Sequence, residues 1–152
     1  MEIERKYLIP KLPADLVLTD GIEYEQGYLC VKPVVRVRRE GEEYWLTYKS
    51  EGLMIREESN LPLTAESYAH LVTKTDGSLI HKTRYFIPYG PNRLIELDIF
   101  HDQLAPLILA EVEFPSEEEA NRFAPPDWFG QEVTFDGRYH NSYLSGLKRY
   151  EP

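Results

Sequence analysis

The sequence predicts a mainly β (α+β) fold, an eight-stranded antiparallel β-barrel with a charged lumen and helices packed on its outer wall. Three observations support this fold class. About eight short strand patterns, separated by turn signals, follow one another along the 152 residues. Most of these strands alternate charged and apolar residues, so that each has one charged face. Closure into a barrel also removes the free edges that such a sheet would otherwise expose.

The strands are bounded by residues that stop or turn a β-strand. Pro33 ends the second strand, because proline lacks the N–H that a central strand requires. Glu40-Gly41-Glu42 is typical of a hairpin turn, and Tyr89-Gly90-Pro91-Asn92 is a stronger turn signal. In chain order, we expect strands at residues 2–9, 25–32, 34–39, 43–50, 53–61, 80–88, 93–100 and 107–114.

Three or four helices are expected between and after these strands, the least regular being a turn or short helix that begins at Pro10–Pro13. Thr64 is a suitable N-cap for a helix whose apolar residues recur from position 68. Ser116 precedes three glutamates, and acidic residues favour the positive end of a helix. The last helix is expected over residues 141–150.

Composition indicates one domain, residues 1–152, which is large enough to bury a substantial core. No segment reaches the ~20 apolar residues that a membrane span needs. The first residues lack the apolar core of a secretory signal, so a cytoplasmic protein is expected. Cys30 is the only cysteine, which excludes an intrachain disulfide and the Cys-rich zinc sites.

The net charge of −9 argues against nonspecific binding to nucleic acid, which requires a basic surface. Taken alone, this charge also disfavours a phosphate-rich substrate, so the distribution of the charges has to be considered. The expected partner is a small molecule, with no nucleic acid and no membrane. A homodimer is left open by the sequence.

The most informative pattern is the repetition of like charges two residues apart. An ordinary solvated sheet face accounts for any single alternating strand. Like charges at positions i and i+2 repel each other, however, and stability alone gives no reason to repeat them on strand after strand. An inside-out barrel, charged within and apolar outside, explains the repetition. The residues of this charged set are Glu2, Glu4, Lys6, Arg36, Arg38, Lys49, Arg56, Glu58, Lys82, Arg84, Glu96, Asp98, Glu111 and Glu113.

The acids and bases of the charged set are equal in number, so the excess of −9 lies entirely on the rest of the chain. Two divalent cations would bring the lumen to about +4, which is similar in size to the charge of an extended triphosphate. Carboxylates bind hard cations through oxygen, and Arg and Lys neutralise phosphate oxygens. The residue types therefore indicate phosphoryl chemistry, without a Gly-rich phosphate loop.

These residues resemble the signature of the CYTH superfamily, the triphosphate tunnel metalloenzymes. Glu2-Ile3-Glu4-Arg5-Lys6 matches its E-x-E-x-K motif, and the resemblance extends in order along nearly the whole chain. Its further segments are Gln26-Gly27-Tyr28-Leu29, Arg36-x-Arg38, Leu46-Thr47-x-Lys49, Arg56-x-Glu58, Lys82-x-Arg84, Glu96-x-Asp98, Glu111-x-Glu113 and the tail Val133-Thr134-x-Asp136-x-Arg138-Tyr139-x-Asn141. One departure is Asn60, where the family often has an acid.

The resemblance implies an eight-stranded tunnel that binds two divalent ions, Mg²⁺ or Mn²⁺, and hydrolyses inorganic triphosphate. It assigns catalysis to Glu2, Glu4, Glu111 and Glu113. The same four glutamates would bind metal, together with Glu58 and Asp98. Phosphate contacts are assigned to Lys6, Tyr28, Arg36, Arg38, Lys49, Arg56, Lys82 and Arg84. Interior ion pairing is the alternative role of the charged residues, and core packing that of Tyr28.

Other activities on the same scaffold remain open. They are a class IV-type adenylate cyclase, a thiamine triphosphatase and a noncatalytic polyphosphate- or nucleotide-binding module. The short chain lacks an insertion that would bind a base, which favours inorganic triphosphate. The tail around Tyr139 is expected to close one mouth of the tunnel. Trp45 is interpreted as a packing or surface residue, and His140 is given no role.

Overall fold

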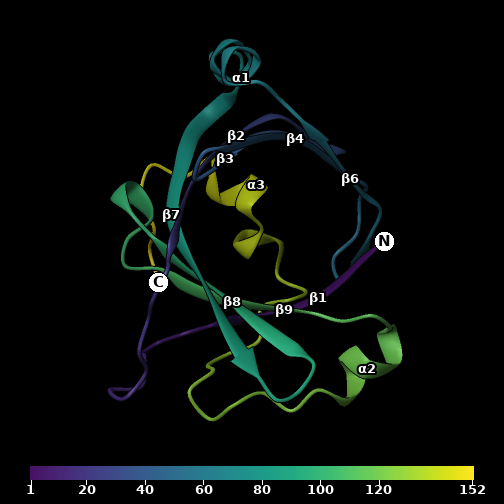
Figure 1. Cartoon of the computed structure of the whole chain (residues 1–152), viewed down its shortest axis with the longest axis vertical. Coiled ribbons are helices and arrows are strands. Elements are labelled where there is room, and N and C mark those ends of the chain that lie inside the picture. Colours follow the sequence, from purple (N-terminus) through teal and green to yellow (C-terminus); the bar gives the residue numbers. More distant parts are fainter.

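The computed structural model describes all residues, 1–152, as one barrel of antiparallel strands with short helices around and inside it (Figure 1). The strands are β1 (Glu2–Leu8), β2 (Ile22–Val31), β3 (Val34–Glu40), β4 (Glu43–Lys49), β5 (Ile55–Arg56), β6 (Glu58–Pro62), β7 (Asp76–Tyr89), β8 (Arg93–Phe100) and β9 (Ile108–Glu113). The helices are α1 (Ala65–Val72), α2 (Glu117–Arg122) and α3 (Asn141–Leu144), with 3₁₀ turns η1 (Asp102–Leu104) and η2 (Gly137–Tyr139). The predicted fold class is confirmed.

The sheet contains nine strands rather than eight, because the chain turns a corner within the expected strand 53–61. The strand order is β5-β1-β9-β8-β7-β2-β3-β4-β6, and every neighbouring pair is antiparallel. Arg56 pairs with β1, whereas Glu58 pairs with β4. Only Glu57 lies between β5 and β6, so the chain itself closes the ring at this point.

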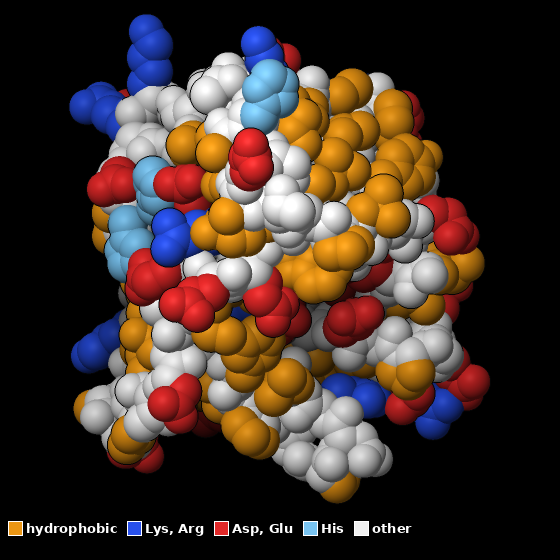
Figure 2. Space-filling view, turned by 45° about the horizontal axis from the view of Figure 1, so that its top comes forward, with side chains coloured by type: hydrophobic (Ala, Val, Ile, Leu, Met, Phe, Trp, Pro, Cys, Tyr) orange, Lys and Arg blue, Asp and Glu red, His pale blue; other side chains and the backbone are white.

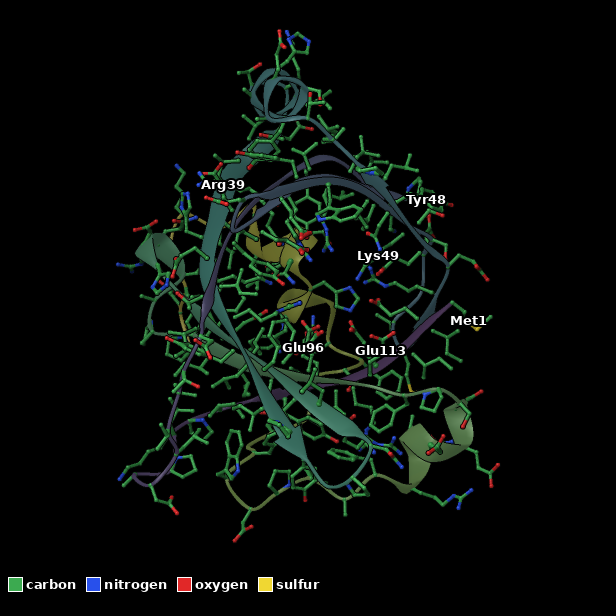
Figure 3. The ribbon with its side chains drawn as sticks, in the orientation of Figure 1. Met1, Arg39, Tyr48, Lys49, Glu96 and Glu113 are labelled. Carbon is green, nitrogen blue, oxygen red and sulfur yellow. The ribbon has the colours of Figure 1, made fainter.

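The two faces of the sheet differ as the alternation predicts. Lys49, Glu96 and Glu113 point into the ring, whereas Arg39 and Tyr48 point away from it (Figure 3). The hairpin between β3 and β4 turns at Gly41, whose φ of 59° lies in the left-handed region that glycine adopts without strain. Acidic side chains are spread over the outer surface, where the net negative charge of the chain was expected (Figure 2).

A first apolar core lies outside the ring. It is built on the outward faces of β1, β8 and β9 and is covered by α2 and by the segment 123–129, which passes below the barrel in Figure 1. Aromatic side chains of that segment pack on it, with the rings of Phe114 and Phe123 5.2 Å apart. The buried members are Ile3, Ile9, Ile95, Leu97, Ala110, Val112, Phe114 and Ala120.

A second apolar core closes one end of the barrel. Helix α3 lies inside the ring (Figure 1) and contributes Leu144, whose side chain is completely buried. The other buried members are Tyr28, Val34, Ile80, Phe100, Leu104, Leu107, Leu109 and Val133. The polar lumen is therefore a blind cavity rather than an open tunnel, and the C-terminal segment forms part of its end.

The helix starts agree with the predicted caps, whereas the last helix is shorter than expected. Thr64 and Ser67 form a reciprocal capping box at the start of α1, and Ser116 caps α2. The last helix ends at Leu144 rather than Tyr150, because the chain reaches Ser145 and Gly146, and glycine weakens a helix. No helix is long and apolar enough to cross a membrane.

Candidate active site

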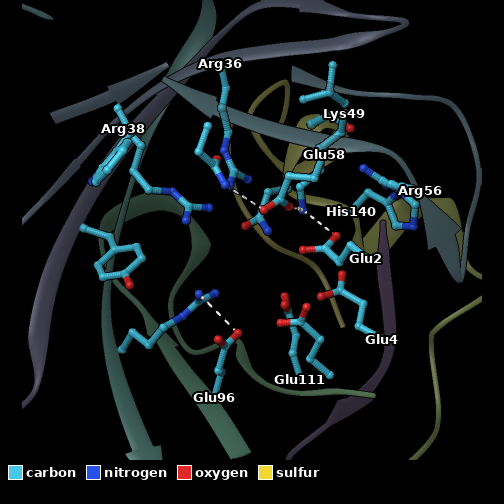
Figure 4. A pocket seen from close by; sticks show the side chains of 18 of the residues that line it. Glu2, Glu4, Arg36, Arg38, Lys49, Arg56, Glu58, Glu96, Glu111 and His140 are labelled. Carbon is cyan, nitrogen blue, oxygen red and sulfur yellow. Dashed lines mark hydrogen bonds and ion pairs between the residues drawn. The ribbon is translucent and has the colours of Figure 1, made fainter. Parts of the chain in front are cut away.

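The barrel encloses a cavity of about 330 Å³, closed at one end by the inner apolar core. The wall of this cavity is almost entirely polar (Figure 4). Only four of its 21 lining residues are hydrophobic, so the cavity offers little apolar surface to a base or thiamine ring. The lining residues are Glu2, Glu4, Lys6, Tyr24, Tyr28, Val34, Arg36, Arg38, Glu40, Trp45, Lys49, Arg56, Glu58, Asn60, Arg84, Glu96, Glu111, Glu113, His140, Asn141 and Ser142.

One wall of the cavity is basic. Arg36 and Arg38 extend from β3 toward the centre of the cavity (Figure 4). Arg38 Nε donates to Gln26 Oε1 at 3.0 Å, and Arg38 Nη1 lies 3.1 Å from Glu40 Oε1. Arg36 is only 5% exposed, yet it forms no ion pair, and its Nε has no hydrogen-bond partner. A buried guanidinium with an unpaired donor is costly unless an anion or water satisfies it.

The opposite wall is acidic. Antiparallel pairing sets Glu4 of β1 directly across from Glu113 of β9, and Glu111 directly across from Glu96 of β8. Like charges placed opposite each other destabilise a sheet. In Figure 4, Glu2, Glu4 and Glu111 lie together on the side that faces the two arginines of β3. Two adjoining acid–acid pairs have no structural benefit, but they suit a bound cation.

Burial and mutual repulsion raise the pKa of the acids nearest this wall. Burial, followed by the charge of Glu111, raises the pKa of Glu4 to about 8. Burial raises the pKa of Glu2 to about 7, although the Lys49 ammonium opposes this effect. Glu113 is shifted upward as well, by burial and by Glu58. A positive charge among these carboxylates would restore their ionised form.

Glu111 behaves differently from its neighbours because it faces several bases. Its carboxylate lies 3.6 Å from Lys6 Nζ, and although burial opposes ionisation, Lys6 and Arg84 hold the pKa of Glu111 well below its usual range. The acidic wall therefore contains one carboxylate, Glu111, that Lys6 holds ionised. The other carboxylates have too little positive charge nearby to keep them ionised. Glu111 is the member best prepared to bind a cation without first losing a proton.

Asp98 and Lys82 do not line the cavity, although both belong to the charged set. Lys82 Nζ donates to Asp98 Oδ2 at 2.7 Å, and both side chains are completely buried. Arg84 donates to both oxygens of Asp98, at 2.6 and 2.8 Å, and its Nη1 is 3.3 Å from Glu96. This network fixes Arg84 from behind, so that its guanidinium is presented to the cavity.

Lys49, Glu58 and Asn60 form a connected group at the corner of the barrel. Lys49 Nζ is 2.9 Å from Glu2 Oε1 and 3.3 Å from Glu58 Oε2. Asn60 donates to Glu58 at 2.8 Å and accepts from Thr47 at 2.6 Å. Asn60 therefore positions Glu58 and adds no charge of its own.

No three carboxylate, imidazole or thiol groups stand close enough together to hold a metal ion as the side chains lie. The chemistry of the acidic wall nevertheless fits a divalent cation, because its donors are carboxylate oxygens and two of its pairs oppose like charges. Glu2, Glu4, Glu111 and Glu113 are the acids of this wall that would hold such an ion.

Known proteins with similar sequences identify the family of this chain. No family model matches the chain. An inorganic triphosphatase of Nitrosomonas europaea is 41% identical over 147 residues, covering 95% of this chain and 96% of that protein. This chain belongs to the inorganic triphosphatases of the CYTH superfamily. A second inorganic triphosphatase, from Acetivibrio thermocellus, is 35% identical and covers 94% of this chain and 92% of its own length.

Solved structures place the inorganic triphosphatase family on the same barrel. The crystal structure of an inorganic triphosphatase aligns with a TM-score of 0.71 and 40% identity, over 97% of this chain and 95% of that chain. A Hippeastrum protein described as an adenylyl cyclase with dominant triphosphatase activity has a TM-score of 0.60 at 14% identity, over 80% and 83% of the two chains. At that identity the likeness concerns the fold alone.

The structure brings together most of the site residues that the sequence predicts for an inorganic triphosphatase. Tyr28 is among them, although it is also a member of the inner apolar core, and its hydroxyl accepts from Gln26 Nε2 at 3.3 Å. Those on the cavity wall are Glu2, Glu4, Lys6, Tyr28, Arg36, Arg38, Lys49, Arg56, Glu58, Arg84, Glu111 and Glu113. Only Asp98 and Lys82 are held away from it.

The cavity is also lined by residues for which the sequence predicted no role. Tyr24, Glu40 and Trp45 lie on inward faces of β2, β3 and β4, so extending the same two-residue period would have found them. His140 and Asn141 come from the C-terminal segment, which has no such period. The tail around Tyr139 was expected to close one mouth of the tunnel, but no pattern in the sequence assigned a role to His140.

Proposed function

We propose that this chain hydrolyses inorganic triphosphate within the barrel cavity, as a divalent-metal-dependent phosphoanhydride hydrolase formed by one domain, residues 1–152. The observation that carries the proposal is the separation of charge across the cavity. Arg36, buried without an acid partner, faces an acidic wall in which Glu4 opposes Glu113. A polyphosphate satisfies the bases, and cations on the acidic wall neutralise its remaining oxygens.

The bases have distinct roles in this proposal. Arg36 and Arg38 bind phosphate oxygens from β3, and Arg84, fixed by Asp98, binds them from β7. Lys6, Lys49 and Arg56 complete the contacts near the acidic wall. Asp98 and Lys82 act indirectly by positioning Arg84, since neither reaches the cavity. Because most of these groups are held by hydrogen bonds before substrate arrives, little reorganisation is needed.

Mg²⁺ or Mn²⁺, expected as two ions, would be held by Glu2, Glu4, Glu111 and Glu113, with Glu58 beside them. When bound, such ions neutralise developing negative charge and acidify water enough to supply hydroxide near neutral pH. Glu111, kept ionised by Lys6, binds without releasing a proton, whereas Glu4 releases one on binding. The small polar cavity favours triphosphate over ATP or thiamine triphosphate.

The test is a phosphate-release and product screen with triphosphate, pyrophosphate, longer polyphosphate, ATP and thiamine triphosphate. We expect triphosphate to be hydrolysed fastest, and activity to disappear with chelator and return with Mg²⁺ or Mn²⁺. Full turnover after exhaustive chelation would refute the metal role, and cyclic AMP as the product from ATP would favour the cyclase. Sedimentation of the same sample tests whether the protein is a homodimer, which the sequence leaves open.

A further inference from the structure

Arg56 is the cavity base with the least support from the sheet. It lies on β5, a strand of two residues, beside a stretch, 51–53, that is exposed. Its backbone pairs with Glu2 of β1 and with no second strand, because the corner at Glu57 separates β5 from β6. A base at such a position needs contacts from its side chain to hold a defined direction.

The side chain of Arg56 has two partners, and neither is a carboxylate. Its Nε donates to the carbonyl of Gly52 at 3.2 Å, and its Nη2 lies 2.6 Å from His140 Nδ1 (Figure 4). The other partnered bases of the cavity, Lys6, Arg38, Lys49 and Arg84, each have a carboxylate within 4.0 Å. Arg56 is therefore oriented without losing its charge to an acid.

The contact fixes the protonation of His140. A guanidinium has donors and no acceptor, so Nδ1 must accept and the imidazole must be neutral, with its proton on Nε2. The surroundings favour that form, because burial and the charges of Lys6 and Arg56 lower the pKa of His140 to about 4. The neutral acceptor is thus present across the whole physiological pH range.

His140 is itself anchored by the C-terminal segment. Its N–H donates to the carbonyl of Gly137, and its own carbonyl accepts from Tyr143 and Leu144 at 3.0 Å each. Leu144 is completely buried in the inner apolar core, so the imidazole starts from a fixed backbone position. The preceding residue, Tyr139, accepts a hydrogen bond from Lys6 Nζ at 3.1 Å through its carbonyl. Two adjacent C-terminal residues therefore hold two bases of the cavity.

We propose that His140 is a positioning residue, whose neutral imidazole holds the Arg56 guanidinium against the cavity and so sets the affinity of the site for the triphosphate class of substrate. This inference rests on the proposed function. Two of the five N–H groups of Arg56 are used by Gly52 and His140, which leaves three for phosphate oxygens. A neutral acceptor orients the guanidinium and preserves its full charge for the substrate, which a carboxylate would not do.

Three variants separate positioning from a purely structural role. His140→Phe keeps the ring volume but removes the acceptor, and we expect KM for triphosphate to rise about tenfold with kcat nearly unchanged. His140→Asn places an amide oxygen near the position of Nδ1 and should restore KM to within about threefold. Arg138→Ala is the control, because Arg138 is an exposed residue of the same segment that pairs with Asp136 and does not line the cavity.

The decisive measurement is a double-mutant cycle with Arg56→Ala. If His140 acts through Arg56, His140→Phe adds nothing to KM in the Arg56→Ala background. Additive effects, or a His140→Asn variant as impaired as His140→Phe at equal melting temperature, would overturn the inference. NMR of the His140 ring should show the Nε2–H tautomer, and Arg56→Ala should alter its signals.

Calorimetric binding of triphosphate, with and without Mg²⁺, keeps this inference separate from the proposed function. A wild-type protein that binds triphosphate without hydrolysing it would refute the hydrolase proposal. In that case a tenfold weaker Kd for His140→Phe would still support the positioning role, and an unchanged Kd would refute it.

Discussion

Arg36 and Arg84 share the inner surface of the barrel but differ in what holds them. Arg84 is clamped by both oxygens of Asp98, whereas Arg36 has no acid partner and an unpaired Nε. The contrast separates a base that the fold stabilises from a base that the fold leaves for a ligand. Arg36 is therefore the residue at which a loss of binding should be least confused with a loss of stability.

Replacement of Arg36 by alanine should raise KM for triphosphate by about 10- to 150-fold, since a charge-assisted hydrogen bond contributes roughly 1.5–3 kcal/mol. The melting temperature should hold or rise, because the change removes a buried charge without an acid partner. Arg39→Ala, on the outward face of the same strand, is the matched control and should leave KM unchanged. A large loss of stability in Arg36→Ala would assign Arg36 a structural role instead.

Glu4→Gln should lower kcat by orders of magnitude and should also change the pH dependence of stability. The folded protein keeps a proton on Glu4, with a pKa of about 8, that the unfolded chain releases near pH 4.5. Binding of this proton stabilises the folded state in full below about pH 4.5, and the stabilisation is lost as the pH rises toward 8. Glutamine does not titrate, so its melting temperature without metal should exceed that of the wild type increasingly over this interval.

The control for this prediction is Glu42→Gln, at the exposed hairpin turn between β3 and β4. It should leave kcat and the pH profile of melting unchanged. A constant difference in melting temperature between Glu4→Gln and the wild type from pH 5 to pH 8 would mean that Glu4 is ionised throughout. A kcat near that of the wild type would remove Glu4 from the catalytic site.

Among the elements, α1 contributes to stability and stands apart from the cavity. It packs outside the ring on β3 and β4, where its Tyr68 is buried against Tyr44, with ring centroids 5.1 Å apart. Its first turn is fixed by the reciprocal hydrogen bonds of Thr64 and Ser67. The helix thus covers an outward face whose opposite side carries the arginines.

Thr64→Ala should therefore reduce the free energy of unfolding by about 1 kcal/mol, the usual effect of losing an N-cap. KM and kcat should remain those of the wild type, because neither capping residue lines the cavity. Chemical denaturation and steady-state kinetics on one preparation make the comparison. A shift in KM would show that α1 and β3 are coupled more tightly than their contacts indicate.

The sequence determines most elements because each carries its own local signal. The alternation of Glu111 and Glu113 with apolar neighbours predicts both the strand and its charged face, and Thr64 marks the start of a helix. The corner at Glu57 has no such signal, since it depends on which strands Arg56 and Glu58 pair with. For the same reason, the alternation places Asp98 correctly inside the barrel but does not show that Arg84 and Lys82 hold it away from the cavity.

At the scale of the whole molecule, the charges are sorted by location. The interior combines a basic wall with an acidic wall, and the excess negative charge lies on the outer surface (Figures 2 and 4). An outer surface of this sign does not attract polyanions, so selection for the substrate takes place inside the barrel. The sequence predicts this sorting from composition and predicts that the tail around Tyr139 closes one mouth of the barrel, but the contact of His140 with Arg56 is seen only in the folded chain.

The inner apolar core has a kinetic consequence. Because Leu144 and its neighbours close one end of the barrel, substrate and products pass through the same opening, and a second triphosphate cannot enter until the first products have left. Pyrophosphate should therefore act as a competitive product inhibitor, raising the apparent KM at a constant maximal rate. Noncompetitive inhibition in initial-rate measurements would contradict this, because it requires pyrophosphate to bind while triphosphate or phosphate still occupies the site.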